Sequence, residues 1–145
     1  MWLYSGLFLS ALSSATLLPG SSEVLLSGLA LTQNANLLML WLIATLGNVL
    51  GSCINYWLGR HVMHFKDSRW FPVTQRQIEK ANAQYARFGS YSLLFAWVPI
   101  IGDPLTVFAG IFKMRKGLFL LLVSLGKGLR YAMVIALAVG IEQLF

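Results

Sequence analysis

Charged residues are scarce in this chain, and long stretches have none. Only 11% of the 145 residues are charged, whereas 57% are hydrophobic. No charged residue occurs from Met1 to Ser22 or from Val24 to Gly59. A water-soluble core helix does not need uncharged runs of that length, whereas a membrane-spanning helix needs about 20 apolar residues. The composition therefore excludes an ordinary soluble domain and predicts an integral membrane protein.

Cysteine and the common catalytic motifs are also missing. Cys53 is the only cysteine, which excludes an intramolecular disulfide. The sequence holds no His-Glu-x-x-His motif, no Gly-x-Ser-x-Gly motif and no P-loop. His61 and His64 are three residues apart, but no third metal ligand is near them. We therefore expect no metal and no other cofactor, and an enzyme is the least expected class.

The apolar residues that are present form four blocks, separated by polar segments rich in basic residues. The blocks cover roughly residues 2–31, 36–58, 88–112 and 117–141. The formal net charge of the chain is +6. In a membrane protein this positive charge indicates topology and contact with anionic lipid headgroups, so we expect no nucleic acid partner.

The polar segment 60–87 lies between the second and third blocks. Its basic residues outnumber Asp67 and Glu79; they are Arg60, Lys66, Arg69, Arg76, Lys80 and Arg87. The positive-inside rule therefore places the segment in the cytoplasm. Thr74 and Gln77 have the spacing of a capping box, which predicts a helix. This helix is either an amphipathic helix on the membrane surface or an ordinary solvated linker helix.

The third block is flanked by basic residues at both ends. Segment 60–87 precedes it, and three more basic residues follow it: Lys113, Arg115 and Lys116. A re-entrant hairpin open to the cytoplasm would keep both basic clusters on the same side of the membrane. Helix-breaking residues occupy the centre of the block, where such a hairpin must turn: Pro99, Gly102 and Pro104.

The first block has the same construction. Pro19 and Gly20 lie near its middle, and the block is long for one span but suits two short half-helices. Because the second block must end in the cytoplasm, the first hairpin is expected to open to the outside. The fourth block then crosses outward, which places both ends of the chain outside.

This order predicts two inverted repeats, residues 1–59 and 88–145, joined by the cytoplasmic linker 60–87 within one membrane domain. The expected fold is an all-α integral membrane protein, in which each repeat is a re-entrant helical hairpin plus a transmembrane helix. Inverted repeats with broken helices are a recurrent transporter plan, and the breaks mark the binding site.

Short sequence matches support the repeat. Pro19 precedes Glu23 by four residues, and Pro99 precedes Asp103 by four, an offset of 80. The stretches Thr-Leu-Gly-Asn-Val-Leu, from residue 45, and Ser-Leu-Gly-Lys-Gly-Leu, from residue 124, align at an offset of 79. The near-equal offsets indicate that the two halves have a common construction.

Four charged residues in the apolar blocks are the candidate site. Glu23 and Asp103 lie at the predicted hairpin tips, where a low dielectric favours the neutral carboxyl group and makes proton coupling a hypothesis. Alternatively, each acid caps the N-terminus of a half-helix. Lys127 and Arg130 are three residues apart on one helix face. They either hold a phosphate headgroup or pair with the two acids in a buried charge network.

The second block offers polar and small residues at helical spacing. Asn48 and Asn55 either line a polar path or form hydrogen bonds between helices. Gly47 and Gly51 form a Gly-x-x-x-Gly step, which predicts close helix packing.

Several stretches of the chain resemble one family. They are FLSALSSATLLPGSSEVLL, TLGNVLGSCINYWLGR, FGSYSLLFAWVPIIGDPLTVFAG and LGKGLRY, and together they are similar to the small YqaA-type members of the DedA family. This family belongs to the wider SNARE-associated Golgi/VTT group of membrane proteins. The resemblance implies a bacterial inner-membrane protein with two re-entrant hairpins and a role in lipid handling. For some members the family role is translocation of undecaprenyl phosphate, often dependent on the proton gradient.

The chain departs from the family pattern in the second hairpin. Larger members carry Arg-Phe-x-Pro-x-x-Arg there, whereas Ala96 and Gly102 occupy the two arginine positions in this sequence. The acid upstream of the first Pro-Gly is absent as well. Our hypothesis is that Lys127 and Arg130 supply the missing positive charge from the following helix.

The leading functional hypothesis is translocation or scrambling of a phospholipid or polyprenyl-phosphate headgroup, coupled to protonation of Asp103 and Glu23 and supporting envelope homeostasis. Because two hairpins and two spans barely enclose a polar site, we also expect a homodimer.

One alternative function is that of a non-transporting structural or assembly factor whose buried charges pair permanently. Another is an exchanger of protons for small ions or drugs.

Overall fold

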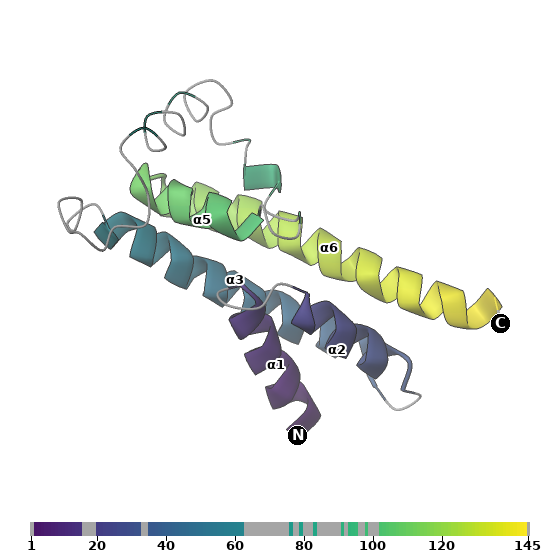
Figure 1. Cartoon of the computed structure of the whole chain (residues 1–145). Helices are drawn as coiled ribbons and strands as arrows, with labels where there is room; N and C mark the ends of the chain where they lie inside the picture. Colours follow the sequence, from purple (N-terminus) through teal and green to yellow (C-terminus); the bar gives the residue numbers. More distant parts are fainter. Residues whose placement is uncertain are drawn as a thin grey trace.

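A computed structural model describes residues 2–15, 20–32, 35–62, 76, 79, 83, 91, 93–95, 98 and 102–144. With the labels of Figure 1, its helices are α1 (Trp2–Ser14), α2 (Ser21–Ala30), α3 (Leu37–Val62), α5 (Gly102–Ile111) and α6 (Lys116–Leu144). No β-strand occurs among the described residues. The predicted all-α class is therefore confirmed.

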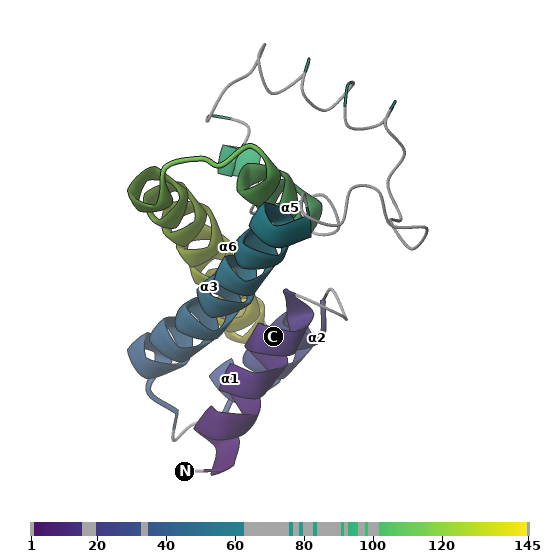
Figure 2. The same ribbon diagram turned by 90° about the vertical axis from the view of Figure 1, so that its left-hand side faces the viewer.

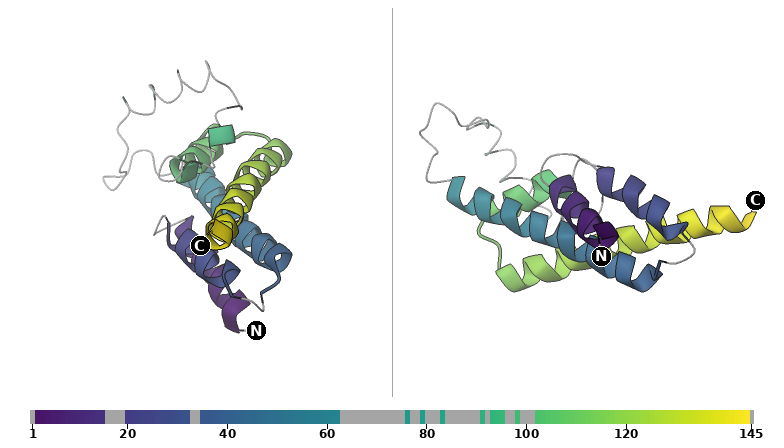
Figure 3. Two further views of the ribbon diagram at one scale, coloured as in Figure 1. Left: turned by 90° about the vertical axis from the view of Figure 1, so that its right-hand side faces the viewer. Right: turned by 90° about the horizontal axis from the view of Figure 1, so that it is seen from below.

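Helix α3 lies at the centre of the molecule and packs against α1, α5 and α6. Figures 1 and 2 show α1 and α2 beside one half of α3 and α5 beside the other half. Helix α6 crosses α3 and also contacts α2. Its link to α5 is a side-chain contact, between Lys127 and Asp103. The C-terminal end of α6 projects beyond the other helices (Figure 3).

Local sequence explains where several helices begin. The side-chain oxygen of Asn36 accepts hydrogen bonds from the backbone N–H groups of Leu38 and Met39, at 3.0 and 3.3 Å, and so caps α3. Gly20 has φ = 93° directly before α2, a left-handed conformation that glycine adopts at little cost.

The predicted hairpin breaks are only partly within the described residues. Gly20 precedes α2, and Gly102 is the first residue of α5. Pro104 lies in the first turn of α5, where its missing N–H would have no helical partner, so the helix accommodates it there. Its role as a hairpin break stays a prediction. Pro19 and Pro99 lie outside the described residues. Of the predicted surface helix only Arg76, Glu79 and Ala83 are described, and all three are helical and exposed.

Small residues allow α1 to approach α3 closely. A Cβ atom added to Gly47 would lie 2.7 Å from the carbonyl oxygen of Phe8. One added to Gly51 would lie 2.8 Å from the carbonyl oxygen of Leu12. Any larger residue would push the helices apart, so the predicted close packing at the Gly-x-x-x-Gly step is confirmed.

A second close approach joins α3 and α5, and the sequence analysis missed it. A Cβ atom on Gly59 would collide with the carbonyl oxygen of Val107, and one on Gly110 would collide with that of Tyr56. The two glycines thus fit backbone against backbone. This contact holds α5 against the C-terminal half of α3.

The long helices are apolar outside and partly polar inside. Leu46 and Leu129 are 57% and 64% exposed, whereas Asn48 and Lys127 are each 1% exposed. This arrangement is the reverse of that in a water-soluble protein and suits a hydrocarbon surrounding. By length and composition, α3 (over Leu37–His61) and α6 are each sufficient to cross a membrane.

Candidate functional site

The four predicted charged site residues come together as two ion pairs. The ammonium Nζ of Lys127 lies 2.9 Å from Oδ1 of Asp103, and the guanidinium Nη2 of Arg130 pairs with Oε1 of Glu23. Both cations come from the middle of α6, and the acids come from the first turns of α5 and α2. One helix therefore links the two groups of short helices through charge.

The pairs are shielded to different degrees. The side chain of Lys127 is 1% exposed, and those of Arg130, Glu23 and Asp103 are 12%, 19% and 24% exposed. A buried charge is strongly unfavourable without a partner, so each cation requires its acid in this arrangement. The acids also lie in the first turns of their helices, where the helix dipole favours negative charge. Of the two sequence hypotheses for the cations, this conformation corresponds to the charge network.

Asn48 connects the charge pairs to the other helices. Its side-chain oxygen accepts a hydrogen bond from Lys127. Its side-chain nitrogen donates to the hydroxyl of Tyr131 at 2.8 Å and to the backbone carbonyl of Ala11 at 3.2 Å. The nitrogen of Asn55 donates to the carbonyl of Ala15 at 2.8 Å. Both amides therefore form hydrogen bonds between helices, the second of the two alternatives; a polar path stays a prediction.

Three hydroxyl groups complete the network, and the sequence analysis gave none of them a role. The Ser22 hydroxyl lies 2.8 Å from the Tyr131 hydroxyl and donates to that of Ser14 at 3.1 Å. Tyr131 is 0% exposed. A signal was available for Tyr131, because it lies four residues after Lys127 and so on the same helix face. Ser14 and Ser22 lie in apolar helices, and no spacing in the sequence connects them with the charged residues.

The described residues provide no cluster that could hold a metal ion. His61 directs Nδ1 at the carbonyl oxygen of Trp57, 2.8 Å away within its own helix. His64 lies outside the described residues. The contacts of His61 are those of an ordinary helix-end histidine.

Known proteins match the chain over most of its length. The VTT domain matches residues 18–139. The "Inner membrane protein YqaA" of Escherichia coli is 41% identical over 133 residues, covering 92% of this chain and 89% of the relative. The protein of the same name from Shigella flexneri has the same identity and coverage. An "Uncharacterized protein" of Haemophilus influenzae is 37% identical over 139 residues, covering 91% and 85%. No solved structure matches.

These matches agree with the apolar outer surface and the two helices long enough to span a membrane. The chain is therefore a membrane protein, and the membrane that its relatives' names specify is the inner membrane. The family resemblance drawn from the sequence is confirmed: the chain belongs to the VTT-domain (DedA) family, as a small YqaA-type member.

Proposed function

We propose that the chain moves the phosphate headgroup of a phospholipid or polyprenyl phosphate across the inner membrane, with protons as the coupling ion. The observation that carries the proposal is the two ion pairs at the middle of α6, one of them with a fully buried lysine. Ionisable residues within a membrane are costly, and those that persist are usually functional. A headgroup phosphate has the charge and the acceptor oxygens to replace a carboxylate opposite Lys127 or Arg130.

The helix lengths support the hairpin architecture that the proposal uses. Helix α1 has 13 residues and α2 has 10. At about 1.5 Å per residue they extend roughly 20 and 15 Å, less than the roughly 30 Å of a bilayer core. Two consecutive short helices packed against each other suit a re-entrant hairpin, with Glu23 near its tip. Helix α5, also of 10 residues, would be the returning arm of the second hairpin.

In the proposed cycle, carboxylate and phosphate alternate as partners of the cations. Protonation of Asp103 or Glu23 removes the negative charge opposite Lys127 or Arg130 and leaves the cation available. The phosphate then pairs with the cation, and the arginine can hold it through two parallel hydrogen bonds. Loss of the proton on the other side restores the ion pair and expels the phosphate. The conformation described here would be the headgroup-free state.

The hypothesis on the missing family arginines gains support from the same geometry. Gly102 occupies one arginine position, and the next residue, Asp103, binds Lys127. The Lys127 ammonium therefore lies at the tip of α5, where an arginine at position 102 would begin the helix. We infer that α6 supplies positive charge at that place.

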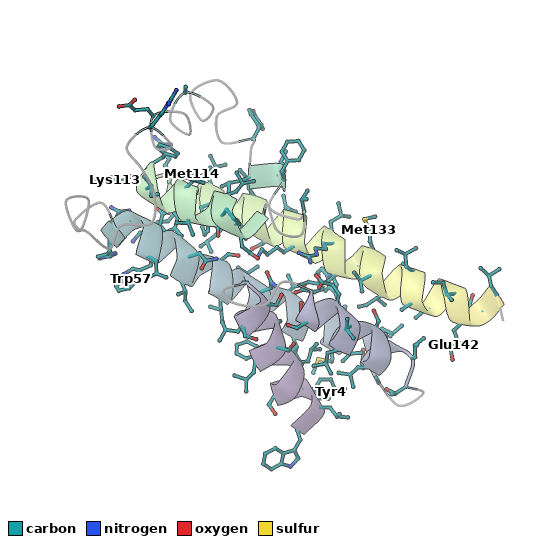
Figure 4. All side chains as sticks on the ribbon, in the orientation of Figure 1. Tyr4, Trp57, Lys113, Met114, Met133 and Glu142 are labelled. Carbon is teal, nitrogen blue, oxygen red and sulfur yellow. The ribbon has the colours of Figure 1, made fainter. Side chains whose placement is uncertain are left out.

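The charge distribution supports a cytoplasmic position for the linker 60–87. Figure 4 shows Lys113, Met114 and Trp57 at one end of the molecule and Glu142 at the other. The end with Lys113 also holds exposed Arg60, Arg115 and Lys116. By the positive-inside rule this end would lie in the cytoplasm, and the N-terminal end of α3 and the C-terminal end of α6 would lie outside. A homodimer stays a prediction, which light scattering of the detergent-solubilised protein would test.

The test is headgroup translocation in proteoliposomes. A fluorescent phospholipid and a polyprenyl phosphate are compared, with and without a pH gradient. Wild type is expected to move one of them, and Asp103→Asn and the double variant Lys127→Ala/Arg130→Ala are expected not to. Glu142→Gln is the control for Asp103→Asn, because it removes one negative charge at an exposed position. Lys113→Gln/Arg115→Gln is the control for the double variant, because it removes two positive charges at exposed positions. Normal movement in the Lys127→Ala/Arg130→Ala variant, correctly inserted, would reject the mechanism.

A structural or assembly role is the second candidate, because all four charged side chains of the candidate site have partners in this conformation. Permanent pairs should tolerate replacement by a neutral pair. Asp103→Asn/Lys127→Gln would then keep every cellular function of the protein, and no lipid would move in proteoliposomes containing folded wild type. Proton flux that depends on a small substrate, without lipid movement, would instead indicate an exchanger.

A further inference from the structure

A second candidate site, whose lining includes none of the four residues of the ion pairs, lies between the C-terminal end of α3 and the N-terminal end of α6. There the structure has a pocket of about 370 Å³. Its rim is basic, formed by Arg60, His61 and Lys116. Its floor is apolar and aromatic, with Tyr56 and Phe119. This volume is within the range of about 300–1,000 Å³ that is usual for small-molecule sites.

The positive charge of the rim is not neutralised by any described residue. The two ion pairs of the described chain involve other residues, and neither Arg60 nor Lys116 has a carboxylate partner there. Within the described part of the chain, Arg60 donates to the hydroxyl of Tyr56, at 3.5 Å. Lys116 is the first residue of α6, where the helix dipole already places positive charge. An anion bound between these groups would relieve their mutual repulsion.

The floor of the pocket is rigid. Tyr56 and Phe119 are 6% and 2% exposed, and their rings pack with centroids 4.6 Å apart. The Tyr56 hydroxyl also donates to the carbonyl of Met114 at 2.5 Å, which fixes the ring against the loop before α6. A topological signal for the positive-inside rule needs no such preformed pocket. The pocket therefore indicates a ligand with an apolar part as well as a charge.

The remaining lining residues show where the apolar part of a ligand would lie. Trp57 and Leu120 line the pocket and are 57% and 43% exposed, on helices whose outer surface faces lipid under the proposed topology. Tryptophan is enriched at the membrane–water boundary, and Trp57 lies near the C-terminal end of α3, where the proposed topology puts that boundary. An amphiphile could thus place its head between the basic residues and its chain along Leu120.

We propose that this pocket binds an anionic phospholipid of the surrounding leaflet, with its phosphate between Arg60 and Lys116 and its glycerol region against Tyr56 and Phe119. The occupant is chosen by charge complementarity and by the exposed apolar surface of Trp57 and Leu120 in the pocket lining. Free phosphate would satisfy the rim but leave the aromatic floor unused. The proposal does not depend on headgroup translocation, because the site does not involve Lys127 or Arg130.

Cys53 provides a native reporter, since it is the only cysteine and it lines the same pocket. The experiment measures the rate of alkylation of the detergent-solubilised full chain by N-ethylmaleimide. Phosphatidylglycerol, phosphatidylcholine and inorganic phosphate are added separately. Phosphatidylglycerol is expected to slow alkylation about fivefold once four-fifths of the pockets are occupied, by simple mass action. Phosphatidylcholine and inorganic phosphate are expected to slow it much less.

Two double variants locate the effect. Arg60→Gln/Lys116→Gln should remove the difference between the two lipids. Lys113→Gln/Arg115→Gln removes the same charge from the same end of the molecule, outside the pocket lining, and should keep the difference. Native mass spectrometry of the same samples counts retained phosphatidylglycerol and does not depend on the reactivity of Cys53. It should show fewer retained lipids only for the first variant.

The outcomes that overturn the proposal are specific. Equal slowing by both lipids would mean that the pocket is merely covered by apolar chains. Equal slowing by inorganic phosphate would assign the site to free phosphate, and equal loss in both double variants would indicate nonspecific charge attraction. Lys127→Ala/Arg130→Ala should still retain phosphatidylglycerol, so failure of the translocation mechanism and failure of this site can be told apart.

Discussion

The ammonium of Lys127 in α6 donates a hydrogen bond to the side-chain oxygen of Asn48 in α3. The two residues are 79 residues apart, and they occupy matching positions of the two stretches that align at that offset. Lysine offers donors only, so it must face the oxygen of the amide, and the nitrogen then points to Tyr131 and Ala11. Asn48 thereby joins three helices at one point.

Asn48→Leu should therefore destabilise the protein substantially. The change leaves Lys127 and Tyr131 each without one partner, and an unsatisfied buried polar group costs about 1–3 kcal/mol. Asn55→Leu is the matched control, because its side chain donates one interhelical hydrogen bond, to Ala15. Thermal unfolding in detergent should show a larger loss for Asn48→Leu. Equal losses would mean that the contacts of Asn48 with Lys127 and Tyr131 contribute nothing to stability.

Glycine contacts give a prediction about packing. Gly59→Ala and Gly110→Ala should each disrupt the fit between α3 and α5, because the new Cβ atom would meet a backbone carbonyl that cannot move independently of its helix. Overpacking of this kind costs about 1–3 kcal/mol or more. The measurement is the melting temperature of the purified variants.

Gly117→Ala and Gly140→Ala are the controls for that series. Both lie in α6 with nothing within 4 Å of an added Cβ atom. Alanine favours the helix over glycine by about 1 kcal/mol, so these variants should be unchanged or slightly more stable. Equal destabilisation of all four variants would contradict the close contact between α3 and α5.

The sequence predicts that the two cations of α6 pair with acids or an anionic ligand, for a physical reason. A membrane interior gives a cation like Lys127 few alternatives to an acid or an anionic ligand, and Glu23 and Asp103 were the acids available in the apolar blocks. The sequence does not predict which acid pairs with which cation. That choice depends on how α2 and α5 lie along α6, which local patterns do not specify.

The hydroxyl network and the second glycine contact were harder to foresee. Ser22 and Gly110 look like ordinary small residues of an apolar helix, and only the packing of distant helices gives them a role. Gly47 and Gly51 were identifiable because their spacing of four places both on one helix face. Sequence patterns thus predict what repeats along one helix, and miss single residues whose partners lie elsewhere in the chain.

Tyr131→Phe tests whether the hydroxyl network contributes to stability. The variant keeps the ring but removes the hydroxyl that binds Ser22 and Asn48. We expect a loss of roughly 1–3 kcal/mol, because both partners stay buried. Tyr91→Phe is the control, since Tyr91 is 75% exposed, and it should be neutral. Chemical unfolding in mixed micelles makes the comparison, and equal stability of the two variants would contradict the network.

The ion pair between Lys127 and Asp103 gives the strongest prediction. Lys127→Gln leaves the partly exposed Asp103 carboxylate without its cation and should cost less than the roughly 3–5 kcal/mol of breaking a fully buried pair. Asp103→Asn leaves the more deeply buried ammonium unpaired and should cost at least as much. The double variant Asp103→Asn/Lys127→Gln removes both charges, keeps polar groups in their places and should recover most of the loss.

The same three variants separate folding from function when stability and translocation are measured together. Under the proposed cycle the double variant is folded but inactive, because the site at Lys127 has lost both the cation that binds the phosphate and the Asp103 carboxylate that binds the proton. Lys113→Gln/Glu142→Gln, which removes one exposed charge of each sign, should stay within about 0.5 kcal/mol of wild type and be fully active. A double variant as unstable as Lys127→Gln would show that the two charges do not act as a pair. A stable and active double variant would assign the pair to structure alone, since a cycle that exchanges carboxylate for phosphate at Lys127 cannot run without either group.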